Sequence, residues 1–218
     1  MSNVKVSTEN LDKKYLLKLI NKERPVIFDI GCYDAKDSLE FMAIKNNVKV
    51  YAFDPNPKIT APFKHQLEAN KNFSLIETAL GNVNGEVEWY KSSNHPASDS
   101  MKIFIDPLKV FKDIKFNKAD PVKCFRLDSW AKDNLREEVI DLMWVDVNGA
   151  EKEFLEGAME TISTKTKFIF IEFNAVGKQK LYKECYTREE ILGDLNDFEE
   201  LGVYDFKGNF GNLLLRKK

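Results

Sequence analysis

The stretch PVIFDIGCYDAKD, residues 25–37, decides the fold. Its apolar run is short, β-branched and aromatic, which predicts a strand buried on both faces, as in a parallel sheet. Gly31 can adopt backbone angles barred to other residues and lets a ligand approach the main chain, and Asp34 is placed to cap a helix that starts near Lys36. Open α/β sheets bind nucleotides at such a strand, turn and helix start, although a purely structural βα turn has the same pattern.

Composition narrows the class of protein. The chain has 218 residues, 43% of them hydrophobic, as expected for one globular domain with a sizeable core. Its 33 basic and 35 acidic residues nearly cancel, so no overall field favours nucleic acid or an anionic membrane. We therefore expect no strong nucleic-acid binding.

The cysteines and the N-terminus indicate the compartment. Cys32, Cys124 and Cys185 are scattered and lack metal-ligand spacing, which favours free thiols in a reducing environment. The N-terminus has no apolar signal region, and no apolar run is long enough for a membrane span. The expectation is a cytoplasmic protein.

Hydrophobic periodicity predicts alternating strands and helices along the chain. The residues at 1–24 are expected to carry an amphipathic helix, and those at 92–121 a polar loop over a site. Strands are expected at 48–53, 74–80, 86–91, 122–127, 140–147 and 167–173, and helices up to 46, at 58–70, from 129, around 154–162 and at 189–198. Segments 200–206 and 210–217 predict a closing antiparallel hairpin in a single domain, residues 1–218.

A second acid follows the next strand. Asp54, followed by Pro55, lies twenty-five residues after Asp29, close to the spacing at which doubly wound folds place an acid on a ribose diol. A carboxylate there would also disfavour a 2′-phosphate. A polar residue that merely ends a buried strand is the alternative.

The first turn discriminates among adenosine compounds. It has one glycine where a dinucleotide fingerprint has three, and Tyr33 and Asp34 crowd the place of a pyrophosphate. An acid-lined turn suits a cationic sulfonium with an amino group. The turn therefore favours S-adenosylmethionine over NAD.

Six segments, in order, resemble the motifs of the FkbM-type methyltransferases, within the class I S-adenosylmethionine-dependent fold. They cover roughly residues 25–173 and read PVIFDIGCYDAKDSLEF, VYAFDPNP, TALGNVNGEVEWY, FRLDSW, IDLMWVDVNGAEKEFLEGA and FIFIEF. The resemblance implies a Rossmann-like α/β fold with a seven-stranded, mostly parallel sheet, an antiparallel last strand and helices on both faces. Cys32-Tyr33, Ala35 and Asn148 depart from the usual family pattern.

The resemblance also implies roles for individual residues. Asp29, Gly31 and Asp34 would line the methionine part of the cofactor, Asp54 would hold the ribose, and Asp146 would face the methyl-transfer centre. Residues 78–80 would border the adenine. The expected cofactor-binding set is therefore Asp29, Gly31, Tyr33, Asp34, Asp54, Pro55, Thr78, Ala79, Leu80 and Asp146.

An alcohol acceptor must lose its proton, so a base is expected near the strand ends. Asp146, Glu151 and His95 are the main candidates, with Glu172 as a fourth. Each could instead be structural, Glu151 for example by favouring a helix N-terminus. Asp128, Asp146 and Glu172 could gather Mg²⁺, but no spacing requires it and no metal is expected.

The acceptor is the least determined part. Trp89 and Tyr90 with the serines of 92–100 would suit a sugar or another polyol, unless Trp89 is simply core. Through the resemblance, the expected activity is O-methylation of a sugar, glycolipid or natural product, with S-adenosylhomocysteine as product. A nicotinamide-dependent oxidoreductase and a catalytically silent adenosine-binding or partner-binding module are the alternatives.

Overall fold

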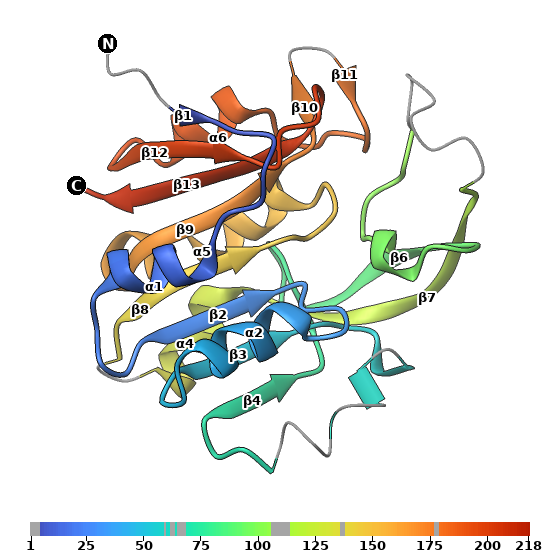
Figure 1. Ribbon diagram of the computed structural model, residues 1–218. Helices are drawn as coiled ribbons and strands as arrows, with labels where there is room; N and C mark the ends of the chain where they lie inside the picture. Colours follow the sequence, from blue (N-terminus) through green and yellow to red (C-terminus); the bar gives the residue numbers. More distant parts are fainter. Residues whose placement is uncertain are drawn as a thin grey trace.

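The computed structural model describes residues 5–58, 60–61, 64, 69–105, 114–135, 138–176 and 179–218. Its main sheet has eight strands in the order β1-β12-β13-β9-β8-β2-β3-β4 (Figure 1). Their bounds are Lys5–Val6 (β1), Phe198–Tyr204 (β12), Gly211–Lys217 (β13), Thr166–Phe173 (β9), Ile140–Val145 (β8), Val26–Ile30 (β2), Lys49–Phe53 (β3) and Phe73–Ile76 (β4). A separate short hairpin pairs β10 (Ala175–Val176) with β11 (Gln179–Lys180).

The sheet has the predicted mixed topology. β2 pairs in parallel with β3 and with β8, so the strand order reverses on either side of β2. β13 runs antiparallel to both of its neighbours, β9 and β12, which confirms the antiparallel last strand. At one edge, β1 adds an eighth strand to the predicted seven by pairing with β12.

Helices cover both faces of the sheet because successive strand residues are apolar on both sides. One face packs against α1 (Lys13–Ile20) and α2 (Lys36–Ile44), with Leu16 and Phe41 fully buried. The other packs against α4 (Leu127–Asn134), α5 (Glu151–Lys165) and α6 (Arg188–Asp194). Figure 1 shows α1 and α2 in front of the sheet and α5 behind it.

Several helix boundaries differ from the predicted ones by a few residues. The carboxylate of Asp12 accepts a hydrogen bond from the Lys14 N–H and so caps α1. A capping box of Thr187 and Glu190 opens α6, which ends at Asp194 instead of the predicted 198. The predicted 58–70 helix is helical at the described positions 58, 60, 61 and 64, whereas residues 69 and 70 form a turn; its other positions lie outside the described residues.

A second sheet stands beside the main one, with the order β5-β7-β6 (Ala79–Leu80, Phe116–Phe125, Gly85–Ser92). The predicted 74–80 strand is thus divided between β4 and β5. The prediction of a loop up to residue 121 is wrong over 116–121, which belongs to β7. Asp120 and Pro121 lie at a bulge between the pairs Val87↔Val122 and Trp89↔Ala119, where a proline costs no ladder hydrogen bond and hides the strand pattern.

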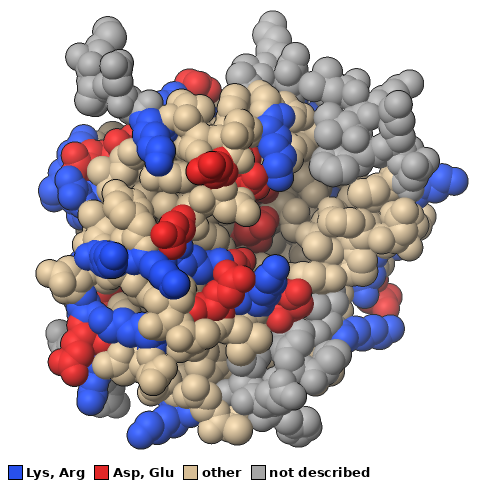
Figure 2. Space-filling model, viewed as in Figure 1, with Lys and Arg blue, Asp and Glu red and all other residues tan. Residues whose placement is uncertain are grey.

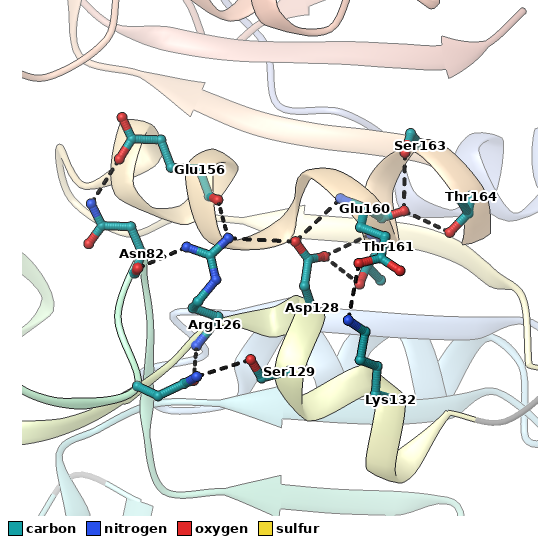
Figure 3. Close-up of polar contacts among 11 residues, drawn as sticks. Asn82, Arg126, Asp128, Ser129, Lys132, Glu156, Glu160, Thr161, Ser163 and Thr164 are labelled. Atoms are coloured by element: carbon teal, nitrogen blue, oxygen red, sulfur yellow. Dashed lines mark hydrogen bonds and ion pairs between the residues drawn. The ribbon is translucent and has the colours of Figure 1, made fainter.

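A polar clamp joins this second sheet to α5 (Figure 3). The Arg126 guanidinium donates to the Asn82 carbonyl at 2.9 Å and to the Glu156 carbonyl at 2.8 Å. Asp128 accepts from the Thr161 N–H and hydroxyl, both at 2.8 Å. The clamp fixes the start of the segment that runs through β6 into residues 92–105.

The packing beneath the clamp is close. A Cβ on Gly157 of α5 would lie 1.8 Å from the Gly81 carbonyl oxygen, so the helix and the turn after β5 meet backbone to backbone. Among the described residues, no helix is both long enough and apolar enough to cross a bilayer.

Candidate active site

The two acidic strand tips lie on neighbouring strands. β2 and β3 pair in register, with Ile30 opposite Phe53, so Asp29 and Asp54 approach the same edge of the sheet. A pocket with an empty volume of about 930 Å³ opens between them. Figure 2 shows a hollow near the middle of the molecule with acidic side chains around it.

The turn after β2 is built from left-handed backbone. Gly31, Tyr33 and Ala35 have φ values of 82°, 46° and 54°. A Cβ on Gly31 would lie 1.8 Å from the Asp146 carbonyl oxygen, so only glycine lets the ends of β2 and β8 approach this closely. Asp34, expected as the cap, does accept from the Lys36 N–H at 3.1 Å, although Ala35 occupies the N-cap position of α2.

Asp54 is a buried carboxylate held by two backbone donors. Its Oδ2 accepts from the Tyr33 N–H at 3.0 Å and its Oδ1 from the Asn56 N–H at 2.9 Å. Burial raises the pKa of Asp54 to about 6 against these hydrogen bonds. Each oxygen keeps a free lone pair, so the group can still accept hydroxyl hydrogens from a ligand.

Asp29 lies deeper. Its Oδ2 accepts a 2.5 Å hydrogen bond from the Ser38 hydroxyl of α2. Burial raises the pKa of Asp29 to about 7. Asp34 and Asp37 are less buried than Asp29 and add two further acids to this wall of the pocket.

The opposite wall comes from β5 and from the start of the polar segment. Thr78, Ala79 and Leu80 are buried and line the pocket together with Pro96, Ala97 and Asp99. Asp99 accepts from the Ser92 N–H at 2.8 Å. Within the predicted 92–121 loop, the pocket is lined by residues in and next to a short 3₁₀ helix, η1 (Pro96–Ser98).

Asp146 follows β8 on the far side of the pocket. The Asp146 side chain is open to water through the pocket and is surrounded by protein on its other sides. This partial enclosure, together with the nearby Asp37 carboxylate, raises the pKa of Asp146 to about 6. The adjacent Asn148 has φ 52° and donates from Nδ2 to the Ala97 carbonyl at 2.9 Å. The Ser100 hydroxyl donates to the Asn148 carbonyl at 2.7 Å, so the polar segment is tied to the end of β8.

Glu151 is beneath this turn, not in the pocket. It is fully buried, its Oε1 accepts from the Gly149 N–H at 3.0 Å, and its Oε2 has no hydrogen-bond partner. Burial raises its pKa to about 8, so the carboxyl is mostly protonated near neutral pH. Asn174 links it to Glu172 by donating to both, at 3.4 and 2.8 Å.

The other candidates lie apart from the pocket. His95 is exposed, and its Nδ1 is 2.8 Å from the Ser98 hydroxyl. Asp128 belongs to the clamp of Figure 3. Within the described residues, no three metal-ligating side chains gather, so Asp128, Asp146 and Glu172 do not form a common site.

All ten residues expected to bind the cofactor line this one pocket. The lining residues that the sequence analysis did not assign to the cofactor include Asp37, Asn56, Asp99, Trp144 and Asn148. Asp37 lies in the first turn of α2, three residues after Asp34, and this proximity was a usable signal. Trp144 gave no such signal, because an aromatic residue in a strand usually packs in the hydrophobic core.

The comparisons with known proteins agree with this geometry. Residues 29–202 match the family model described as the methyltransferase FkbM domain. The chain belongs to the FkbM methyltransferase family. It is accordingly an S-adenosylmethionine-dependent methyltransferase, and the resemblance noted in its motifs is confirmed.

Relatives of this FkbM-family chain include the 2-O-methyltransferase NoeI of Sinorhizobium fredii (strain NBRC 101917 / NGR234). The two are 30% identical over 209 residues, which is 93% of this chain and 84% of NoeI. Among solved structures, methyltransferase FkbM from Methylobacillus flagellatus KT has a TM-score of 0.54 at 11% identity over 88% of this chain, which spans 44% of that longer protein. An S-adenosylmethionine-dependent methyltransferase from Aquifex aeolicus has a TM-score of 0.52 at 12% identity, covering 95% of this chain and 90% of its own.

Proposed function

We propose that this methyltransferase transfers the methyl group of S-adenosylmethionine to a hydroxyl of a small polyhydroxylated molecule, such as a sugar, the sugar of a glycolipid or a natural product. The assignment of S-adenosylmethionine as donor rests on one pocket between the ends of β2 and β3, which all ten expected residues line. The 2-O-methyltransferase relative supports oxygen as the accepting atom.

In this proposal the donor lies across the strand ends. Asp54 accepts hydrogen bonds from the ribose diol, since both of its oxygens are already oriented by backbone donors. Asp29 and Asp34 supply negative charge for the amino group and the sulfonium. Residues 78–80 and Asp99 border the adenine.

The chain's own contribution to the reaction is position and proton transfer. Holding the acceptor oxygen in line with the S–CH₃ bond can supply roughly 7–11 kcal/mol of the barrier. The oxygen lone pair forms the new O–CH₃ bond as the S–CH₃ bond breaks, its electron pair stays on sulfur, and S-adenosylhomocysteine leaves. Asp146 takes the hydroxyl proton, because it faces the pocket at the end of β8 and the surrounding protein brings its pKa near neutrality.

Calorimetry with S-adenosylmethionine, S-adenosylhomocysteine and NAD tests the donor assignment. We expect both sulfur compounds to bind and NAD to bind far more weakly. Binding of NAD alone would replace the proposal with a nicotinamide-dependent reaction. Labelled-methyl transfer to a panel of sugars and glycolipids then tests the acceptor class, and donor binding without transfer to any hydroxyl compound argues for a silent binding module.

A further inference from the structure

A second groove opens on the α1 and α2 side of the donor pocket. It has an empty volume of about 1180 Å³ including its mouth, and it shares Asp37, Trp144 and Asp146 with the donor pocket. Its outer wall is the chain around Asn10 and the start of α1, and its far end is formed by Asp205 and Asn212. The two cavities therefore meet at Asp146, the residue that faces the reacting methyl group in the proposed function.

Strand register places a row of polar groups beside this groove, and two of them, Asp146 and Asn212, line it. Trp144 is paired with Phe170, and Phe170 with Leu214, so these three lie on one face of β8, β9 and β13. Residues two positions along a strand return to the same face. Asp146, Glu172 and Asn212 therefore form the next row on that face, with Glu172 directly opposite Asn212.

The row borders an aromatic floor. The Trp144 and Phe170 rings stack with centroids 4.1 Å apart, Lys13 Nζ lies 5.0 Å from the Trp144 ring centroid, and Trp144 is only half-buried. The exposed part of the indole beside acceptor groups matches a sugar ring, which has C–H faces and hydroxyl edges.

The charges of the groove restrict what it can hold. Its lining includes five acids, Asp12, Asp37, Glu40, Asp146 and Asp205, and two lysines, Lys13 and Lys14. Lys13 is bridged by Asp37 and Glu40, each at 2.5 Å, and Asp205 pairs with Lys207 at 3.1 Å. Acids therefore outnumber lysines along the groove, and a ligand carboxylate placed there would meet mostly like charges.

We infer that this groove is the acceptor site and that it selects an uncharged or amino-bearing polyol ring against an anionic one. The inference rests on the proposed function, since it assumes that the methyl donor occupies the neighbouring pocket. The acceptor ring lies beside Trp144, its reacting hydroxyl reaches Asp146, and Asn212 bonds another of its hydroxyls.

The test uses the full chain loaded with S-adenosylhomocysteine and three matched probes: a methyl hexoside, its amino-sugar analogue and the corresponding uronate. Saturation-transfer NMR at millimolar probe concentration reads binding without needing the true acceptor. We expect the neutral and amino probes to bind and the uronate to bind about tenfold more weakly or not at all. Asn212→Trp and the exposed rim variant Asn10→Trp should each abolish probe binding, while Ser74→Trp, on the distant β4 edge, should not.

Circular dichroism and S-adenosylhomocysteine affinity show whether each variant is folded, and Asn10→Trp remains informative if Asn212→Trp does not fold. Equal uronate binding, probe binding that survives both groove variants, or a loaded protein that binds none of the probes would overturn the acceptor site. A wild-type protein that fails to bind S-adenosylhomocysteine would instead overturn the proposed function.

Discussion

The backbone N–H of Tyr33 donates to Oδ2 of Asp54 at 3.0 Å, which ties the turn after β2 to the end of β3. The turn is further held by the Gly31 and Cys32 N–H groups, which both donate to the Phe53 carbonyl, at 2.9 and 3.0 Å. Asp54 therefore helps to fix the shape of this turn, and both line the same pocket. Loss of the Asp54 carboxylate should weaken ligand binding by removing its own contacts and by changing the geometry of the turn.

Replacing this carboxylate is the first prediction. Asp54→Ala should weaken S-adenosylhomocysteine binding by about 1–3 kcal/mol, because the ribose would lose its charged acceptor and two backbone N–H groups would lose their partner. Titration calorimetry measures the change. Glu77→Ala is the matched control, since Glu77 is an exposed acid paired with Lys64 and does not line the pocket. Unchanged affinity in a folded Asp54→Ala protein would reject the ribose assignment.

Donor affinity should also depend on pH. Burial raises the pKa of Asp54 to about 6 and that of Asp29 to about 7, so both carboxylates become protonated as the pH falls through this range. A cationic donor should then bind about tenfold more weakly at pH 5 than at pH 8. In Asp54→Asn the part of this dependence near pH 6 should disappear. A flat affinity profile in the wild type would contradict the prediction.

The same raised pKa values have the opposite effect on the stability of the unliganded protein. Both folded-state pKa values lie above the ordinary aspartate value of 3.8, so the folded state binds protons more tightly than the unfolded state. The contribution of these two groups to the free energy of unfolding is complete below about pH 4 and is lost as the pH rises through 6 and 7. Ligand affinity and the intrinsic stability of the pocket should therefore oppose each other across this range.

A packing prediction concerns Gly157. Gly157→Ala should lower the free energy of unfolding by about 1–3 kcal/mol, because its Cβ would lie 1.8 Å from the Gly81 carbonyl oxygen and force α5 away from the turn. Gly193→Ala in α6 is the control, since its Cβ would have open space, and it should stabilise by up to about 1 kcal/mol. Urea unfolding separates the two. Equal effects of the two substitutions would show that the close contact is not limiting.

Local patterns predicted the parts of the fold that depend on neighbouring residues. The turn after β2 and the closing hairpin could be predicted because glycine placement and alternation act over a few residues. The division between β4 and β5 and the strand at 116–121 could not, because the second sheet is mostly solvent-facing and Pro121 occupies a bulge. Hydrophobic periodicity fails where a strand buries little on either face.

The candidate site divides in the same way. Asp29 and Asp54 could be found because Asp29 is the last residue but one of β2 and Asp54 directly follows β3, and the strands prove to be neighbours. Asp99 reaches the pocket because hydrogen bonds from Asn148 hold residues 97–99 against the end of β8. Glu151 has the right residue type and spacing, but its helix turns it beneath the pocket.

The clamp of Figure 3 gives a stability prediction with a built-in comparison. Arg126→Met should cost about 1–3 kcal/mol, because the Asn82 and Glu156 carbonyls lose their guanidinium donors. Lys132→Met removes only an exposed 3.4 Å ion pair with Glu160 and should cost no more than about 1 kcal/mol. Thermal unfolding of both variants checks this order. A larger loss in Lys132→Met would mean that the clamp does not anchor the second sheet.

Replacing Asp146 and Glu151 by their amides should have different effects on the reaction rate. Asp146→Asn should lower kcat by about 10²–10⁴-fold and leave S-adenosylhomocysteine affinity within a few-fold, because the amide keeps the shape of the pocket wall but cannot accept the hydroxyl proton. Glu151→Gln should keep kcat within a few-fold, since burial raises the Glu151 pKa to about 8 and an amide resembles the protonated acid that accepts from the Gly149 N–H. Single-turnover rates with labelled donor, alongside calorimetry, separate the two roles. If Asp146→Asn loses rate and affinity equally, Asp146 binds the donor and is not the base, and a collapse of kcat in Glu151→Gln would move the proton transfer to Glu151.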